Sequence, residues 1–118
     1  MIELELPWPP TVNTYYSVVN TRKILSKKGR SYKAESLKRA SETYRGTTRK
    51  IQGECEVGIL AYVPDFRKRD LDNILKPILD CLVDGHYIDD DSLIQRLQIE
   101  RREKTKGGLI IVYVKEWK

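Results

Sequence analysis

The sequence predicts an α+β fold: a single small domain with a mixed β-sheet and helices packed on one face of that sheet. The length of 118 residues suits one domain, residues 1–118, that buries its own core. Strand-like and helical patterns follow in the order strand, hairpin, helix, strand, helix, strand, strand. Hydrophobic residues make up 40% and charged residues 33% of the chain, which argues against a disordered or membrane-spanning protein.

The first part of the chain predicts a strand and then a hairpin. Met1–Leu6 alternates apolar and acidic residues, as a half-buried strand does. Pro7–Pro10 ends that strand, because proline has no N–H group to donate to a sheet. Tyr15–Val19 and Lys23–Leu25 predict a short hairpin that turns at Asn20-Thr21.

The segment from about Gly29 to Arg45 has helical periodicity. Its apolar stripe is narrow and most of its cations lie on other faces, so we expect a helix on the surface of the domain. Cys55–Val63 has the composition of a buried strand, and Pro64 ends it.

The strongest helical pattern covers Leu71–Leu82, where six leucine and isoleucine residues form one face. Asp70 or Asp72 is expected to cap its N-terminus, Pro77 to kink it and Gly85 to end it.

Two strands complete the predicted sheet. Leu93–Arg101 alternates in the manner of a strand, and Leu109–Val114 is an apolar run far too short to cross a bilayer. Lys104–Gly108 forms the loop between them.

Charge is distributed unevenly along the chain. The net charge is +5, yet residues 22–50 carry +9 and the rest of the chain is net negative. A basic block of this kind suggests a surface that faces a polyanion such as nucleic acid, although a solvated helix face explains the same pattern. Its candidate phosphate-binding residues are Lys27, Lys28 and Arg30.

Two acidic clusters flank the strongest helix. Asp70 and Asp72 precede it, and Asp89–Asp91 follows it. If both clusters lie at the same edge of the sheet, their carboxylates converge, and two such charges 4 Å apart repel by about 4 kcal/mol at an effective dielectric of 20. A bound cation would relieve this repulsion, and ligands that are all oxygen select Mg²⁺ or Mn²⁺ over zinc.

Each cluster also has a structural interpretation. Asp70 and Asp72 suit helix caps, Asp89–Asp91 suits a solvated turn, and Lys76 suits an ion pair with Asp72 four residues earlier.

The cations beside the first cluster favour chemistry instead. Carboxylates for a divalent cation, next to arginines that hold phosphate oxygens, are what metal-assisted phosphodiester hydrolysis needs. Lys76 would then stabilise charge in the transition state. The phosphate contacts would come from Arg67, Lys68 and Arg69.

Aromatic rings near a basic surface are candidates for stacking on unpaired bases. Tyr15 and Tyr16 follow a proline-rich turn close to Asn13, and these three residues complete the predicted DNA contacts. Trp8 is expected in the core or a turn, and His86 in a loop without a catalytic role.

The remaining features argue against other classes of protein. The acidic, alternating N-terminus is unlike a signal or transit peptide. Cys55 and Cys81 lack metal-site spacing and are expected as reduced core residues of a cytoplasmic protein. We expect no organic cofactor and no membrane contact.

Several of these motifs together resemble the RusA-type Holliday-junction resolvases of bacteria and their prophages. The resemblance rests on the Pro-Trp-Pro-Pro sequence at Pro7–Pro10, the Arg-Asp-Leu-Asp-Asn sequence at Arg69–Asn73 and the Asp-Asp-Ser sequence at Asp90–Ser92. It extends over nearly the whole chain and also includes Lys76, Asp80 and Lys106–Gly108. Phe66 departs from the more basic pattern of some relatives.

The resemblance implies a homodimeric, Mg²⁺-dependent endonuclease that binds four-way DNA junctions and nicks two opposing strands symmetrically. By motif position, Asp70, Asp72 and Asp91 match the metal-binding carboxylates and Lys76 the catalytic lysine, while a one-residue slip would select Asp90 in place of Asp91. One active site per subunit suits the approximate two-fold symmetry of a junction.

Two other functions stay open at this point. The same carboxylates would serve a metal-dependent nuclease that acts on another branched or single-stranded nucleic acid. If the acids are only caps and a turn, the chain is a DNA-binding protein without catalytic activity.

Overall fold

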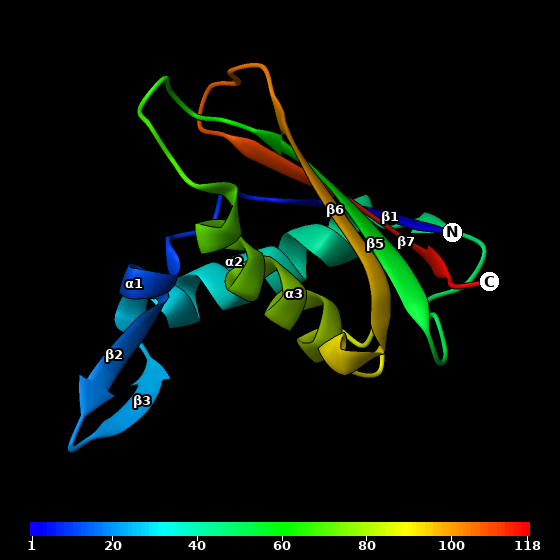
Figure 1. Cartoon of the computed structure of the whole chain (residues 1–118), viewed down its shortest axis with the longest axis horizontal. Coiled ribbons are helices and arrows are strands. Elements are labelled where there is room, and N and C mark those ends of the chain that lie inside the picture. The colour runs from blue at the N-terminus through cyan, green and yellow to red at the C-terminus, as the bar shows by residue number, and fades with distance from the viewer.

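A five-stranded sheet and two long helices form two layers in the computed structural model, which describes residues 1–118 (Figure 1). The strands of this sheet are β1 (Ile2–Leu6), β4 (Arg45–Gly46), β5 (Cys55–Tyr62), β6 (Ile94–Arg102) and β7 (Leu109–Glu116). They lie in the order β4-β1-β7-β5-β6. β5 and β6 are parallel and the other neighbours antiparallel, so the sheet is mixed, as predicted.

The long helices lie on the same face of the sheet, also as predicted (Figure 1). The helical elements are α1 (Val12–Tyr15), α2 (Lys27–Thr43) and α3 (Leu75–Asp84), with 3₁₀ turns η1 (Leu71–Ile74) and η2 (Asp91–Leu93). α3 forms the crossover that the parallel strands β5 and β6 require. No helix is long and apolar enough to cross a membrane.

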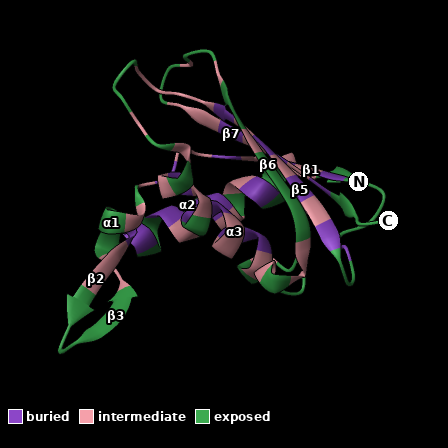
Figure 2. Cartoon of the chain, viewed as in Figure 1, coloured by how far each residue is buried: buried purple, intermediate pink, exposed green.

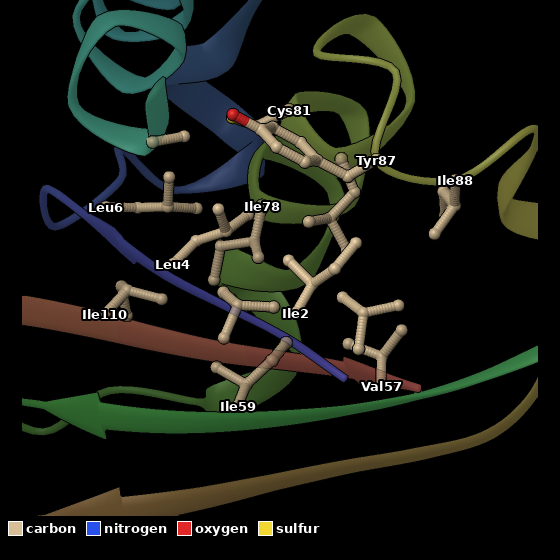
Figure 3. Close-up of a cluster of buried hydrophobic side chains, with 14 of the residues drawn as sticks. Ile2, Leu4, Leu6, Val57, Ile59, Ile78, Cys81, Tyr87, Ile88 and Ile110 are labelled. Carbon is tan, nitrogen blue, oxygen red and sulfur yellow. The ribbon is translucent and has the colours of Figure 1, made fainter. Parts of the chain in front are cut away.

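The core lies between the helices and the sheet (Figure 3). β1 and β5 alternate buried and half-buried residues, so each strand turns one side of its pleat to the helices. Ile2 and Leu4 from β1 and Ile59 from β5 meet Ile78 from α3 there. Both cysteines are buried and free, as expected.

α2 begins at Lys27, two residues before the predicted start. The Ser26 hydroxyl caps it by accepting a hydrogen bond from the Gly29 N–H at 2.9 Å. The buried stripe of this helix includes Tyr32, Ser36 and Ala40, in agreement with the periodicity of the sequence.

The predicted hairpin is confirmed and projects from the body of the domain (Figure 2). β2 (Tyr16–Val19) pairs with β3 (Arg22–Leu25). Asn20 and Thr21 form the turn with φ values of 50° and 64°, the positive angles that a two-residue hairpin turn needs.

The start of the strongest helix differs from the prediction. Leu71–Ile74 forms the 3₁₀ turn η1, and the α-helix starts only at Leu75. Asp70 occupies the cap position of η1 without a side-chain cap hydrogen bond, so the predicted carboxylate cap is not formed. Pro77 is the third residue of α3, where an N–H has no intrahelical partner, and the helix continues through it. Gly85 ends the helix, as predicted.

Candidate active site

Lys76, the second residue of α3, contacts one acid of its own helix and one acid of the second predicted cluster. Its Nζ lies 2.9 Å from the Asp80 carboxylate and 3.6 Å from the Asp91 carboxylate. Asp91 begins η2, so an acid from beyond the helix lies next to a lysine near its start. The hydrogen bond with Asp80 raises the pKa of Lys76, which keeps this side chain cationic at neutral pH.

Asp80 is held on its other side by Tyr15. The Tyr15 hydroxyl donates a hydrogen bond to Asp80 Oδ2 at 3.1 Å, and the Tyr15 side chain is fully buried. Burial, followed by the charge of Asp80, raises the pKa of Tyr15, so its hydroxyl stays a donor. Lys76 and Tyr15 thereby fix the position of the Asp80 carboxylate between α1 and α3.

Sequence reasoning did not place Asp80 in the site. The signal was its position four residues after Lys76, which is the spacing of a helix-surface ion pair. Lys76 pairs with Asp80 and not with Asp72, because η1 replaces the α-helical turn that the Asp72–Lys76 pair would need.

Asp70 and Asp72 present free carboxylates. Both residues are exposed, and no hydrogen bond or ion pair within the protein engages either side chain. They flank the start of η1, directly after the basic loop that follows β5.

The two acidic clusters do not share an edge of the sheet. Asp70 and Asp72 follow the carboxyl end of β5, whereas Asp91 precedes the amino end of β6. Because β5 and β6 are parallel, these two ends lie at opposite ends of the strands. No three His, Cys, Asp or Glu side chains are grouped closely enough to hold a metal ion. Lys76 contacts the second cluster through Asp91 but forms no ion pair with Asp70 or Asp72.

The composition of the donor set still fits a hard divalent cation. Mg²⁺ in proteins is commonly held by one or two carboxylates, with water and substrate phosphate in its other positions. Asp70 and Asp72 supply two carboxylates without competing partners, whereas Asp91 is engaged by Lys76 at the other end of the parallel strands.

The acids next to Asp91 stabilise the local backbone. Asp90 accepts hydrogen bonds from the backbone N–H of Ser92, at 3.1 Å, and from its hydroxyl, and these bonds lower the pKa of Asp90. Asp89 lies 2.5 Å from Lys50. Asp91 is thus the member of the triplet that faces Lys76.

The three cations before Asp70 differ in availability. Arg69 pairs with Asp65 at 2.7 Å and its guanidinium lies 5.7 Å from the centre of the Trp8 ring, so this side chain builds the loop. Arg67 is exposed but pairs with Asp65 at 3.2 Å. Lys68 is exposed and unpaired, which leaves it as the cation most free to contact a phosphate.

The aromatic prediction needs correction at one residue. Tyr15 is fully buried and cannot stack on a base. Tyr16 is half-buried, and Lys23 Nζ lies 4.5 Å from its ring centre. Asn13 is exposed on α1.

The candidate cations of the basic block lie at the start of α2. Lys27 and Lys28 are exposed and have no acidic partner. Arg30 is also exposed, but its Nη1 donates to the Leu25 carbonyl at 2.8 Å and so stabilises the end of the hairpin.

A second basic loop, which the sequence predicted as a loop but not as part of the site, lies against the first. The Thr105 N–H donates to the Val63 carbonyl at 2.8 Å, and Arg101 Nη2 donates to the Arg69 carbonyl at 2.6 Å. We call residues 63–70 and 103–108 the loop pair; both loops project beyond the same end of the sheet in Figure 1. The sequence signal was a cluster of four cations, namely Arg101, Arg102, Lys104 and Lys106.

Comparison with known proteins agrees with this arrangement. Residues 7–115 match the family model described as Endodeoxyribonuclease RusA. The crossover junction endodeoxyribonuclease rusA of Enterobacteria phage HK97 is 33% identical over 113 residues, which cover 94% of this chain and 91% of that protein. The crossover junction endodeoxyribonuclease RusA of Escherichia coli strain K12 is 32% identical over 117 residues, with 96% and 92% covered. The chain therefore belongs to the RusA family of endodeoxyribonucleases.

Proposed function

We propose that this chain is a Mg²⁺-dependent, structure-specific endonuclease that resolves Holliday junctions, which are four-way DNA, by paired symmetric nicks in recombination and repair. We also propose that it acts as a homodimer. The observation that carries the proposal is the contact of Lys76 with Asp91, together with the exposed, unpaired carboxylates of Asp70 and Asp72, in a chain whose relatives are named crossover junction endodeoxyribonucleases.

Asp70, Asp72 and Asp91 would hold the Mg²⁺, with Mn²⁺ as a substitute. When bound, the ion would polarise the scissile phosphate and lower the pKa of the attacking water. The exposure of Asp70 and Asp72 and their lack of internal partners support this role, since no ion pair or hydrogen bond has to break before they bind.

Lys76 would stabilise the negative charge that builds on the phosphate in the transition state. Two acids now share its ammonium group, at 2.9 and 3.6 Å. If Asp91 turns to the metal, one side of the ammonium becomes free for a phosphate oxygen, while Asp80 and Tyr15 keep the lysine in place.

The exposed, unpaired cations Lys27, Lys28 and Lys68 would contact DNA phosphates. Such contacts supply affinity and salt sensitivity but no choice of sequence. A homodimer follows from the substrate: two opposing strands of a two-fold symmetric junction need two active sites, and each chain holds one Lys76.

The test is Asp72→Asn on a synthetic mobile four-way junction, with linear duplex, flap and single-stranded DNA as controls, in Mg²⁺, Mn²⁺ or EDTA. We expect the wild type to make paired nicks only on the junction and only with the metal. Asp72→Asn should bind the junction as well as the wild type, or slightly better because one negative charge is gone. Its cleavage rate should fall by at least about a hundredfold.

Glu42→Gln is the matched control, because it removes one exposed, unpaired carboxylate far along the chain from the site, on α2. It should cleave like the wild type. Retained cleavage by Asp72→Asn would contradict the proposal. Equal cleavage of flaps or single strands would point to a nuclease with another substrate, and binding without metal-dependent cleavage of any DNA would point to a DNA-binding protein.

A further inference from the structure

Phe66, in the first loop of the loop pair, is the most exposed large apolar side chain of the protein, at 84%. A hydrophobic ring in water is unfavourable and is usually turned inward when the backbone allows it. The reason for this exposure lies in the turn that carries Phe66.

Asp65 holds that turn rigidly. Its carboxylate accepts hydrogen bonds from the Arg67 N–H at 2.9 Å and from the Arg67 guanidinium at 3.2 Å, and it pairs with Arg69 at 2.7 Å. These interactions join the residues on either side of Phe66 and leave its side chain exposed to solvent. Their sum lowers the pKa of Asp65, with the Arg69 hydrogen bond as the largest cause, so the turn is intact at neutral pH.

The turn is also fixed to its surroundings. Arg69 lies over the Trp8 ring, and its carbonyl accepts from Arg101 of β6. The ring of Phe66 is therefore held by a loop that is already fixed in place. This lowers the entropic cost of ordering the loop when a ligand binds to the ring.

The surroundings of Phe66 are cationic and not apolar. Lys104 Nζ lies 5.3 Å from the centre of its ring, and Lys68 and Lys106 are exposed nearby in the two loops. An apolar protein partner would have to desolvate these charges, whereas a nucleic acid offers phosphates for the cations and a base for the ring. Because bases inside a duplex are already stacked on both faces, the ring needs a base that is unstacked.

We propose that Phe66 stacks on a nucleobase that is unstacked at the branch point of the junction, with Lys104 and Lys68 holding the phosphates beside it. The inference rests on the proposed function and adds a positioning residue to it. Phe66 lies only four residues before Asp70, so a base held there would set the scissile phosphate relative to the carboxylates. The stack would favour branched over linear DNA, which the phosphate contacts alone do not.

The test compares Phe66→Ala, Phe66→Leu and Phe66→Trp, each combined with Asp72→Asn so that the DNA stays intact. Dissociation constants are measured for a fixed four-way junction and for a linear duplex of equal sequence. Stacking on one base predicts that Phe66→Ala weakens junction binding by about 5- to 150-fold while duplex binding changes by less than about twofold. Phe66→Trp should bind at least as well as Phe66, and Phe66→Leu should resemble Phe66→Ala because it lacks a ring.

Permanganate footprinting gives an independent readout, since it modifies unstacked thymines. With Phe66 in place, a thymine at the branch point should be protected when the protein binds, because the ring covers one of its faces; with Phe66→Ala it should stay reactive at saturating protein. Leu97→Ala is the matched control, because Leu97 is a large apolar side chain, 38% exposed on β6, outside both candidate DNA-binding regions.

Three outcomes would overturn the inference: unchanged junction binding by Phe66→Ala, an equal loss on linear duplex, or full recovery by Phe66→Leu. These outcomes differ from failure of the proposed function. If the parent Asp72→Asn protein does not prefer the junction over the duplex, the junction substrate itself is wrong. If that preference is present and survives Phe66→Ala, only the role of Phe66 is wrong.

Discussion

The interaction of Asp80 with Lys76 decides how one charge is placed in the candidate site. Asp80 is one-fifth exposed and Lys76 nearly half exposed, so solvent screens the pair and its value for stability is small. The pair matters more for holding the Lys76 ammonium group in one position. Without Asp80, Lys76 would keep only the longer contact with Asp91, at 3.6 Å, and a flexible four-carbon chain would move its charge away from the phosphate.

Asp80→Asn is therefore expected to lower the cleavage rate by about 10- to 100-fold while junction binding stays within about twofold of the wild type. Asp84→Asn is the matched control, because Asp84 lies on the same helix and pairs with Lys33, outside the site. It should leave cleavage unchanged. Single-turnover rates and dissociation constants measured in parallel separate this outcome from loss of folding; a loss of binding equal to the loss of rate would contradict the positioning role.

The same pair predicts a pH dependence. Asp80 is the main reason that the pKa of Lys76 is raised. The contribution of the Lys76 charge to the cleavage rate is therefore complete at pH values below the ordinary pKa of lysine. It is lost as the pH rises through the raised pKa. In Asp80→Asn the pKa returns toward the ordinary value, so the alkaline loss of cleavage should begin at lower pH. Identical alkaline limbs for the two proteins would show that Lys76 does not control the rate.

At the scale of elements, the contact between α1 and α2 connects the fold to the site. Gly29 of α2 lies directly against the carbonyl oxygen of Tyr15, and a Cβ at this position would clash with that oxygen. Tyr15 in turn donates to Asp80. A change in the packing of α1 against α2 would therefore shift Tyr15 and, through Asp80, the position of Lys76 on α3.

Gly29→Ala should destabilise the protein by about 1–3 kcal/mol, because backbone must move to accept the methyl group. Helix propensity alone would predict the opposite sign, a gain of up to about 1 kcal/mol. Urea unfolding measures the free energy of unfolding. Ser31→Ala, at an exposed position on the same helix, is the control, and helix propensity predicts for it a small gain of about 0.5 kcal/mol. Stabilisation by Gly29→Ala would show that the close contact with Tyr15 is not maintained.

Elements were predictable from the sequence where one chain segment buries one face. The alternation of β5 and the leucine–isoleucine face of α3 follow directly from burial, and the hairpin follows from local turn geometry. α1 and β4 are only four and two residues long, too short to show a period.

The details of the site depend on contacts between distant segments, which periodicity does not report. The hydrogen bond from Tyr15 to Asp80 joins residues 65 positions apart. The same holds for Arg69, for which charge alone suggested a DNA contact and which also pairs with Asp65 and lies over the Trp8 ring. Spacing paired Lys76 with Asp72, and only the family resemblance grouped Lys76 with Asp91; neither showed that Asp70 and Asp72 stay apart from Asp91.

At the scale of the whole molecule, the two candidate DNA-binding regions lie far apart on one chain. The hairpin and the start of α2 project from one end in Figure 1, and the loop pair projects beyond the end of the sheet. With principal dimensions of 39 × 36 × 25 Å, one chain can contact DNA on both sides of a single scissile phosphate but carries only one Lys76 and one Asp72. We therefore expect coordinated cleavage of two strands to need two chains.

Mixing wild-type and Asp72→Asn subunits tests this directly. The substrate is a supercoiled plasmid with an extruded cruciform. Paired nicks made in one binding event give linear plasmid, whereas a single nick releases the supercoiling, reabsorbs the cruciform and gives open circles.

In an equal mixture of the two proteins with free exchange of subunits, about half of the dimers carry one active site. We therefore expect open circles to rise at the expense of linear plasmid, and pure wild-type protein diluted to the same active-site concentration to give mainly linear plasmid. If the ratio of linear to open-circular product is the same in both samples, the chains cut independently and the homodimer is contradicted, even where the DNA substrate is correct.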